Sequence, residues 1–129
     1  MKTLEEIEKI GSRIIGAAII VHSHLGPGLL ESAYQKCLCC ELQQQGHTVR
    51  CEVPLPIKYR GHSIEVGYRL DMIVEECVLV ENKTVEKINP VHEAQLLTYL
   101  RLNEYQLGYL LNWNVAFMKH GIKRMVNRL

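Results

Sequence analysis

The sequence predicts a mixed α/β domain of the α+β kind, in which helices pack on a sheet in the order αα-ββββ-α-β. Three changes of pattern lead to this prediction. Apolar residues recur at helical spacing through residues 4–45, and residues 48–83 then form short segments with the alternation typical of strands. Helical spacing returns at residues 90–102, and the continuous apolar run at 105–115 has the length and aromatic content of a buried strand.

The composition limits the kind of protein this is. The chain has 129 residues, of which 47% are hydrophobic, so residues 1–129 fit one globular domain with apolar residues enough for a core. The formal net charge is only +1, whereas a protein that relies on nonspecific attraction to phosphates is usually far more basic. A nucleic-acid partner would therefore need a local basic surface.

The N-terminus and the cysteines indicate a cytoplasmic protein with no membrane partner. The first residues are acidic where a secretory signal would be basic and then apolar. The apolar stretch at residues 14–21 is shorter than the roughly 20 residues that a membrane-spanning helix needs. The five cysteines fit the same compartment as reduced thiols.

Both N-terminal helices have sequence signals at their ends. Thr3 followed by Glu6 is a capping box, which predicts that the first helix begins near residue 4. Gly26-Pro27-Gly28 interrupts the helical pattern, and the second helix is expected from about Leu29 to Gln45. Gly46 is a natural residue to end it.

The strand region begins after Gly46. Residues 48–59 alternate but contain Pro54 and Pro56, which favours an edge strand. A turn at Arg60-Gly61 leads to three further strands at 62–66, 68–74 and 77–83. The last helix is expected to begin near Pro90, and residues 117–129 read as a short tail that turns at His120-Gly121.

Two neighbouring strands carry the charges on which a site can be built. Glu81 and Lys83 share one face of their strand because side chains alternate. A two-residue turn at Glu75-Glu76 would place Asp71 opposite Val80, whereas a three-residue connection would place Asp71 directly opposite Glu81. We predict the three-residue connection, because that register alone brings the two carboxylates together.

Two adjacent carboxylates repel each other unless a cation lies between them. Mg²⁺ is the natural occupant, since it takes oxygen ligands and often needs one or two carboxylates besides water and phosphate oxygens. Lys83 could orient the attacking water or stabilise charge that develops on a phosphate. Asp71, Glu81 and Lys83 are thus a minimal set for metal-assisted phosphodiester hydrolysis. The alternative is a solvated hairpin with ordinary surface charges.

Three local sequences together resemble the GxxExxY protein family of the PD-(D/E)XK nuclease superfamily. They are Gly28-Leu29-Leu30-Glu31-Ser32-Ala33-Tyr34, Asp71 with Glu81-Asn82-Lys83, and His92-Glu93-Ala94-Gln95-Leu96-Leu97-Thr98-Tyr99. The resemblance covers nearly the whole chain in the right order. It implies a restriction-endonuclease-like core, with a central mixed sheet flanked by helices and a divalent metal at the carboxylates.

The resemblance also implies a role for each site residue. Asp71 and Glu81 would be metal ligands, Lys83 the catalytic lysine, and Glu31 the auxiliary acid that completes the metal site. Gln95 and Tyr99, one turn apart on a helix, would support the site or contact the nucleic-acid backbone. Two residues depart from the superfamily pattern: Leu70 replaces the proline before Asp71, and Asn82 replaces an apolar residue. If Asn82 faces the core, it needs hydrogen-bond partners.

Several of these residues have a second interpretation. Glu31 is also a first-turn acid that the helix dipole favours, and Gln95 is also a polar surface residue. His92 lies one turn before Gln95 and could line the site. We interpret Tyr34 as a packing residue, His22 and His24 as structural, and Trp113 as part of the core. The basic residues Lys119, Lys123, Arg124 and Arg128 could form a phosphate-contact surface or a solvated tail.

The sequence therefore supports two hypotheses. The first is a Mg²⁺- or Mn²⁺-dependent nuclease that hydrolyses phosphodiester bonds of nucleic acid, with DNA the expected form. The second is a non-catalytic module of the same fold that binds nucleic acid or protein. In either case so small a core would need a homodimer or a protein partner to recognise its target.

Overall fold

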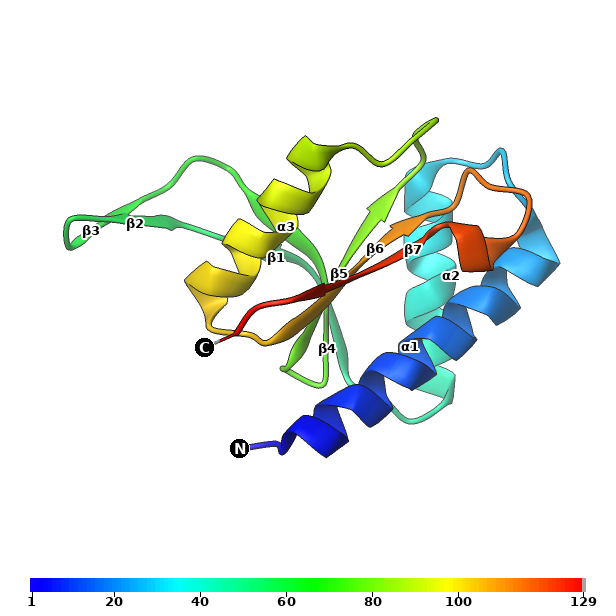
Figure 1. The fold of residues 1–129 in the computed structure, drawn as a ribbon, viewed down its shortest axis with the longest axis horizontal. Helices are drawn as coiled ribbons and strands as arrows, with labels where there is room; N and C mark the ends of the chain where they lie inside the picture. Colours follow the sequence, from blue (N-terminus) through cyan, green and yellow to red (C-terminus); the bar gives the residue numbers. More distant parts are fainter. Residues whose placement is uncertain (129) are drawn as a thin grey trace.

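The computed structural model describes residues 1–128, and Figure 1 shows their arrangement. It contains three α-helices, seven strands and one 3-10 helix in the following order: α1 (Leu4–Leu25), α2 (Glu31–Gln44), β1 (Val49–Pro54), β2 (Ile57–Tyr59), β3 (His62–Ile64), β4 (Arg69–Val74), β5 (Val78–Lys83), α3 (Pro90–Asn103), β6 (Leu107–Asn112), η1 (Met118–His120) and β7 (Ile122–Val126).

Helix ends follow the local signals in the sequence. The Thr3 hydroxyl accepts a hydrogen bond from the Glu6 N–H, and the Glu6 carboxylate accepts one from the Thr3 N–H, so the predicted capping box is present. The second helix begins two residues later than predicted, at Glu31. Pro90 occupies the first turn of α3, where its missing N–H costs no hydrogen bond.

Five strands form a mixed sheet in the order β1-β4-β5-β6-β7. Neighbouring strands are antiparallel except β5 and β6, which are parallel and are joined through α3. A parallel pair needs such a long crossover connection. The mixed sheet flanked by helices that the resemblance implied is therefore confirmed.

The sheet has helices on both faces. In Figure 1, α1 and α2 lie on one side of the strands and α3 lies on the other. Val78, Val80 and Tyr109 pack toward α1 and α2, whereas Leu79 and Leu110 pack against Leu96 and Leu100 of α3. Each face thus buries its own apolar cluster, so the central strands are covered on both faces.

The first predicted strand is two strands. Residues 48–59 were expected to form one edge strand, but the chain breaks at Pro54-Leu55-Pro56 into β1 and β2. The first piece is an edge of the five-stranded sheet, whereas β2 pairs with β3 in a separate two-stranded sheet. The Pro56 nitrogen has no hydrogen to donate to a ladder, which explains why pairing with β4 stops here.

The prediction of a tail is wrong for residues 118–126, which form regular structure. Residues 118–120 form η1, and residues 122–126 form β7, which pairs with β6 along its whole length and is the second edge of the sheet. The turn at His120-Gly121 is present, since the Gly121 N–H donates to the Met118 carbonyl. Within residues 1–128, no helix has the length and apolarity to cross a membrane.

Candidate functional site

The β4–β5 hairpin has the three-residue connection that the sequence analysis predicted. Val74 pairs with Val78 and Met72 pairs with Val80, a register that places Asp71 across from Glu81. The two residues are linked directly, because the Asp71 N–H donates to Glu81 Oε1 at 3.2 Å. Glu75 and Glu76, at the turn, both have positive φ, at 53° and 54°. The register therefore brings together the two carboxylates that the motif contains.

Both carboxylates are shielded from water, Glu81 more than Asp71. Glu81 exposes 6% of its surface, and Asp71 is half-buried with Oδ2 accepting the Asn82 N–H at 2.8 Å. Burial first, and the Asp71 carboxylate second, raise the pKa of Glu81 to about 8. Burial also raises the pKa of Asp71, while the Asn82 N–H opposes the rise. Two negative charges at these positions would therefore destabilise the fold unless a positive charge lies beside them.

Lys83 ends the same strand and acts on the pair electrostatically. Its side chain is half-buried, and its positive charge lowers the pKa of both Asp71 and Glu81. Its backbone is fixed as well, because the Lys83 carbonyl accepts the Trp113 N–H at 2.9 Å. The structure therefore brings Asp71, Glu81 and Lys83 into one neighbourhood at one end of β4 and β5.

Two further acids lie near Asp71. Glu31 is the exposed first residue of α2, and its charge raises the pKa of Asp71. Glu52 of β1, which the sequence analysis did not single out, has the same effect. Cys51 pairs with Met72 and Val53 with Leu70, so Glu52 lies across from Asp71 on the other side of β4.

Glu52 has an unusual backbone for a residue within a strand. Its φ is 53°, in the left-handed region that costs non-glycine residues about 1 kcal/mol or more. Its carboxylate accepts a hydrogen bond from Gln35 Nε2 of α2 at 2.8 Å. Together with Gln35 and Cys39 it lines a cavity of about 300 Å³ between α2 and β1. No motif in the sequence marks Glu52, because only the pairing of β1 with β4 brings it to Asp71.

The two motif residues of α3 differ in burial. Tyr99 is 6% exposed, and burial, followed by the charge of Glu81, raises its pKa, so its ring lies close to the acidic pair. Gln95 is exposed, and its side chain lowers the pKa of Tyr99, in opposition to burial. His92 instead belongs to the helix start, because its Nδ1 accepts the Asn89 N–H at 3.2 Å. Tyr68 also approaches the site, with its ring 6.3 Å from that of Tyr99.

A buried polar network supports the carboxylates from behind. Asn82 is fully buried, and the requirement for partners is met: Oδ1 accepts the Trp113 indole N–H at 2.9 Å and Nδ2 donates to Gln35 Oε1 at 3.3 Å. Trp113 and Tyr34 are also fully buried and stack with ring centroids 4.9 Å apart. Both are therefore core residues, as predicted. Because Asn82 also donates its backbone N–H to Asp71, the network fixes the position of one ligand candidate.

Tyr34 and His22 have structural roles near this network. The Tyr34 hydroxyl donates to the Gly26 carbonyl at 2.5 Å and accepts the Leu29 N–H at 3.1 Å, so it holds the loop that precedes Glu31. His22 is buried and its Nε2 lies 2.9 Å from the Val115 carbonyl oxygen. His24 is exposed at the end of α1.

The basic residues near the C-terminus do not form one surface. Lys123 pairs with Glu93 of α3 at 3.7 Å, whereas Arg124 pairs with Glu8 of α1. These partners lie on opposite faces of the sheet, because consecutive strand residues point in opposite directions. The cluster seen in the sequence is therefore divided between two faces, and part of its charge is already balanced.

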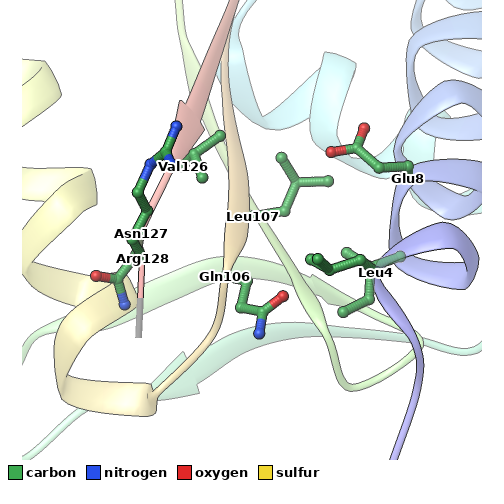
Figure 2. Close-up of a pocket in the computed structure, with 8 residues that line it drawn as sticks. Leu4, Glu8, Gln106, Leu107, Val126, Asn127 and Arg128 are labelled. Carbon is green, nitrogen blue, oxygen red and sulfur yellow. The ribbon is translucent and has the colours of Figure 1, made fainter.

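A cavity of about 400 Å³ lies at the other end of the sheet (Figure 2). Leu4, Glu8, Leu107 and Val126 are among the residues that line it. Leu107 pairs with Val78, at the start of β5, whereas Glu81 pairs with Leu110 toward its end. The cavity is thus separate from the carboxylates and does not contribute to the candidate site.

The donor set at the site meets part of what a divalent cation requires. Asp71 and Glu81 lie side by side where little water reaches them, and the pKa of each is raised. A divalent cation would stabilise the ionised form of both carboxylates, and their oxygens are ligands of the kind it prefers. Among residues 1–128, no three side chains of the His, Cys, Asp or Glu type are arranged to hold a metal ion. Asp71 and Glu81 are thus two oxygen donors, and a divalent cation bound to them would need water or phosphate oxygens as its other ligands. The side chain of Glu31 does not complete a three-ligand site in this arrangement.

Fold and site together define a restriction-endonuclease-like domain. A mixed sheet between helices carries an acidic pair and a lysine on adjacent central strands. The family model of the PD-(D/E)XK nuclease superfamily matches residues 8–125, and the chain belongs to this superfamily. No significant match exists among curated proteins or among solved structures.

Proposed function

We propose that the protein is a divalent-metal-dependent nuclease that hydrolyses phosphodiester bonds of DNA. The observation that carries the proposal is the hairpin register, which puts Asp71 across from Glu81 with the charge of Lys83 beside them. Membership of the nuclease superfamily supports a nuclease-type function and a nucleic-acid substrate. Within the superfamily we assign the chain to the GxxExxY proteins, on Gly28, Glu31 and Tyr34.

Each residue of the site has a role in this proposal. Asp71 and Glu81 would hold Mg²⁺ or Mn²⁺, and Glu31, whose charge already acts on Asp71, would be the auxiliary acid. The ion supplies positive charge that stabilises the phosphate in the transition state. Lys83 orients the attacking water and balances the charge that develops on the phosphate.

The reaction is a hydrolysis in which atoms and charges balance. The oxygen of water forms a bond to phosphorus, and the bond from phosphorus to the leaving sugar oxygen breaks. One proton of the water is lost and the leaving oxygen gains a proton, which gives a phosphate monoester and a free hydroxyl. The charge of Glu81 raises the pKa of Tyr99, and the side chain of Gln95 lowers it. In this proposal the two residues support the site or contact the nucleic-acid backbone.

Calorimetry with Mn²⁺ is the first test. The unaltered protein should bind the ion, and Asp71→Asn with Glu81→Gln should lose that binding while the fold remains, as checked by circular dichroism. Glu5→Gln is the matched control, because Glu5 is an exposed acid on α1. Bound Mn²⁺ should also stabilise the unaltered protein by about 2.7 kcal/mol at a hundredfold excess over Kd.

Cleavage of labelled DNA with Mn²⁺ is the second test. Lys83→Met should bind the ion normally but cleave about 10²–10³-fold more slowly, the usual cost of one lost electrostatic group. Lys9→Met on α1 should cleave at the normal rate. Mn²⁺ binding without cleavage would instead identify a binding module. Absence of Mn²⁺ binding, with DNA present, would overturn the proposal.

A further inference from the structure

The chain carries a projecting hairpin that the proposed reaction does not use. Residues 55–68, here called the arm, connect β1 to β4 and contain β2 and β3. Within residues 1–128, β2 and β3 form a two-stranded sheet of their own, and Figure 1 shows it extending away from the helices and the central sheet. Every residue from Lys58 to Arg69 is exposed. The arm therefore gains little from the core of this chain.

Such an arm is costly unless something covers it. An isolated two-stranded hairpin is marginally stable in water, yet this one exposes large apolar side chains. Tyr59 is 59% exposed and Ile64 is 40% exposed, and both lie on the same face because Ile57 pairs with Ile64 and Tyr59 pairs with His62. One face of the arm thus presents aromatic and apolar groups to solvent.

The charge of the arm indicates what would cover it. The arm carries Lys58 and Arg60, with Arg69 at its base, against the single acid Glu65. Arg60 is in the turn with φ of 49°, so its side chain is at the far end of the hairpin. Among the ion pairs of residues 1–128, none involves Lys58 or Arg60. This is the kind of local basic surface that a chain of net charge +1 needs to bind phosphate groups.

The base of the arm is joined to the candidate site. The Leu55 N–H donates to the Tyr68 carbonyl at 2.8 Å, which closes the arm at its base. The Tyr68 ring lies 6.3 Å from that of Tyr99, and Asp71 follows Tyr68 by three positions. A nucleic acid that contacted the arm would therefore continue past the acidic pair.

We propose that the arm enters the major groove of double-stranded DNA beside the bond that is cleaved. This inference rests on the proposed nuclease function. A two-stranded ribbon fits the major groove, which is about 12 Å wide and 8.5 Å deep. Three strand residues at about 3.4 Å each carry the turn some 10 Å from its base. Lys58 and Arg60 contact phosphates, and the face formed by Tyr59 and His62 meets the base edges.

The test is binding of a labelled DNA duplex, followed by fluorescence anisotropy over a range of salt concentrations. All variants carry Asp71→Asn and Glu81→Gln, so that no cleavage occurs during the measurement. Lys58→Ala with Arg60→Ala should weaken binding at least tenfold at low salt. It should also reduce the slope of log K against log salt by about 1.8, which corresponds to two phosphate contacts.

Two controls separate the arm from charge in general. Lys9→Ala with Arg13→Ala removes two exposed positive charges from α1 and should leave affinity and slope unchanged. Tyr59→Ala should weaken duplex binding several-fold without changing the slope, because it removes no charge. Circular dichroism of each variant checks that the fold is intact, which is expected because the altered side chains are exposed.

The outcomes distinguish this inference from the proposed function. If the cleaving protein binds DNA and the Lys58 and Arg60 variant binds it with the same affinity and slope, the inference is wrong and the nuclease function stands. Arm-dependent binding of single strands but not of duplex would exclude the major groove. A dimer that Tyr59→Ala dissociates, with unchanged DNA binding, would show that a second copy covers the arm. If neither the unaltered protein nor any of the variants binds DNA, both proposals fail.

Discussion

Strand β5 and the arm are both short β-structures, but they relate to the rest of the chain in opposite ways. The first five residues of β5 are buried, and the strand is hydrogen-bonded to β4 on one side and β6 on the other. The arm pairs with itself and exposes both faces. The fold therefore depends on β5, whereas the arm contributes to the core only through Leu55 at its base.

This difference explains where charge is tolerated. In β5, Glu81 is placed where burial raises its pKa to about 8, a position that opposes folding at neutral pH. In the arm, Lys58 and Arg60 lie in water and cost nothing to fold. Buried charge in one region and solvated charge in the other suggest two functions, with the chemistry at the sheet and recognition by the arm.

The largest expected effect comes from truncating matched aliphatic residues in the two regions. Leu79→Ala should lower the free energy of unfolding by about 3 kcal/mol, because Leu79 is fully buried against α3 and would leave a cavity. Ile64→Ala should lower it by less than about 0.5 kcal/mol, because Ile64 is 40% exposed in the arm. Urea denaturation measures both. Equal losses would mean that the arm is part of the cooperative core.

A smaller effect, of opposite sign, is expected from Glu81→Gln without metal. A carboxyl group whose pKa is raised in the folded state favours folding fully below its ordinary pKa, and this contribution is lost as pH rises toward about 8. Gln cannot ionise, yet its Oε1 can still accept the Asp71 N–H. The variant should therefore match the unaltered protein near pH 4, below the ordinary pKa of Glu, and exceed its stability by about 2 kcal/mol at pH 8.

Denaturation at both pH values measures the effect of Glu81→Gln. Glu86→Gln, an exposed acid in the loop after β5, is the control and should change neither value. A variant that is less stable than the unaltered protein at pH 8 would show that the ionised carboxylate supports the fold. That result would contradict the inference that the acidic pair needs a cation to hold two negative charges.

The smallest effect is expected from Gly61→Ala in the turn of the arm. Gly61 has φ of 82°, so alanine would be strained there by about 1 kcal/mol. The global free energy of unfolding should change by less than about 0.5 kcal/mol, because the arm can open alone. Hydrogen exchange of the β2 and β3 amides should become faster, while exchange in β5 stays the same.

The same substitution in a helix is the control for the arm. Gly16 lies in the middle of α1 with open space where a Cβ would be. Gly16→Ala should therefore raise the free energy of unfolding by about 0.5–1 kcal/mol. If Gly61→Ala lowers the global free energy of unfolding by the full strain of about 1 kcal/mol, the arm folds together with the sheet.

Local chemistry made some of these features predictable. The capping box at Thr3, the helix start at Pro90 and the buried strand near residues 107–112 follow from hydrogen bonding and periodicity within a few residues. The register of Asp71 and Glu81 was also predictable, since one connection length alone puts both carboxylates on adjacent positions. These arguments need no knowledge of distant parts of the chain.

Pairing over long distances decided the rest. The sequence by itself determined the three helices, the β4–β5 hairpin, the strand near residues 107–112 and the motif residues Asp71, Glu81 and Lys83, because each depends on neighbours in the chain. Only the tertiary structure decided that residues 122–126 are an edge strand, that Lys123 and Arg124 face opposite helices, and that Glu52 lies across from Asp71. The pattern of a short strand shows which face is apolar, but it does not show which strand will be its partner.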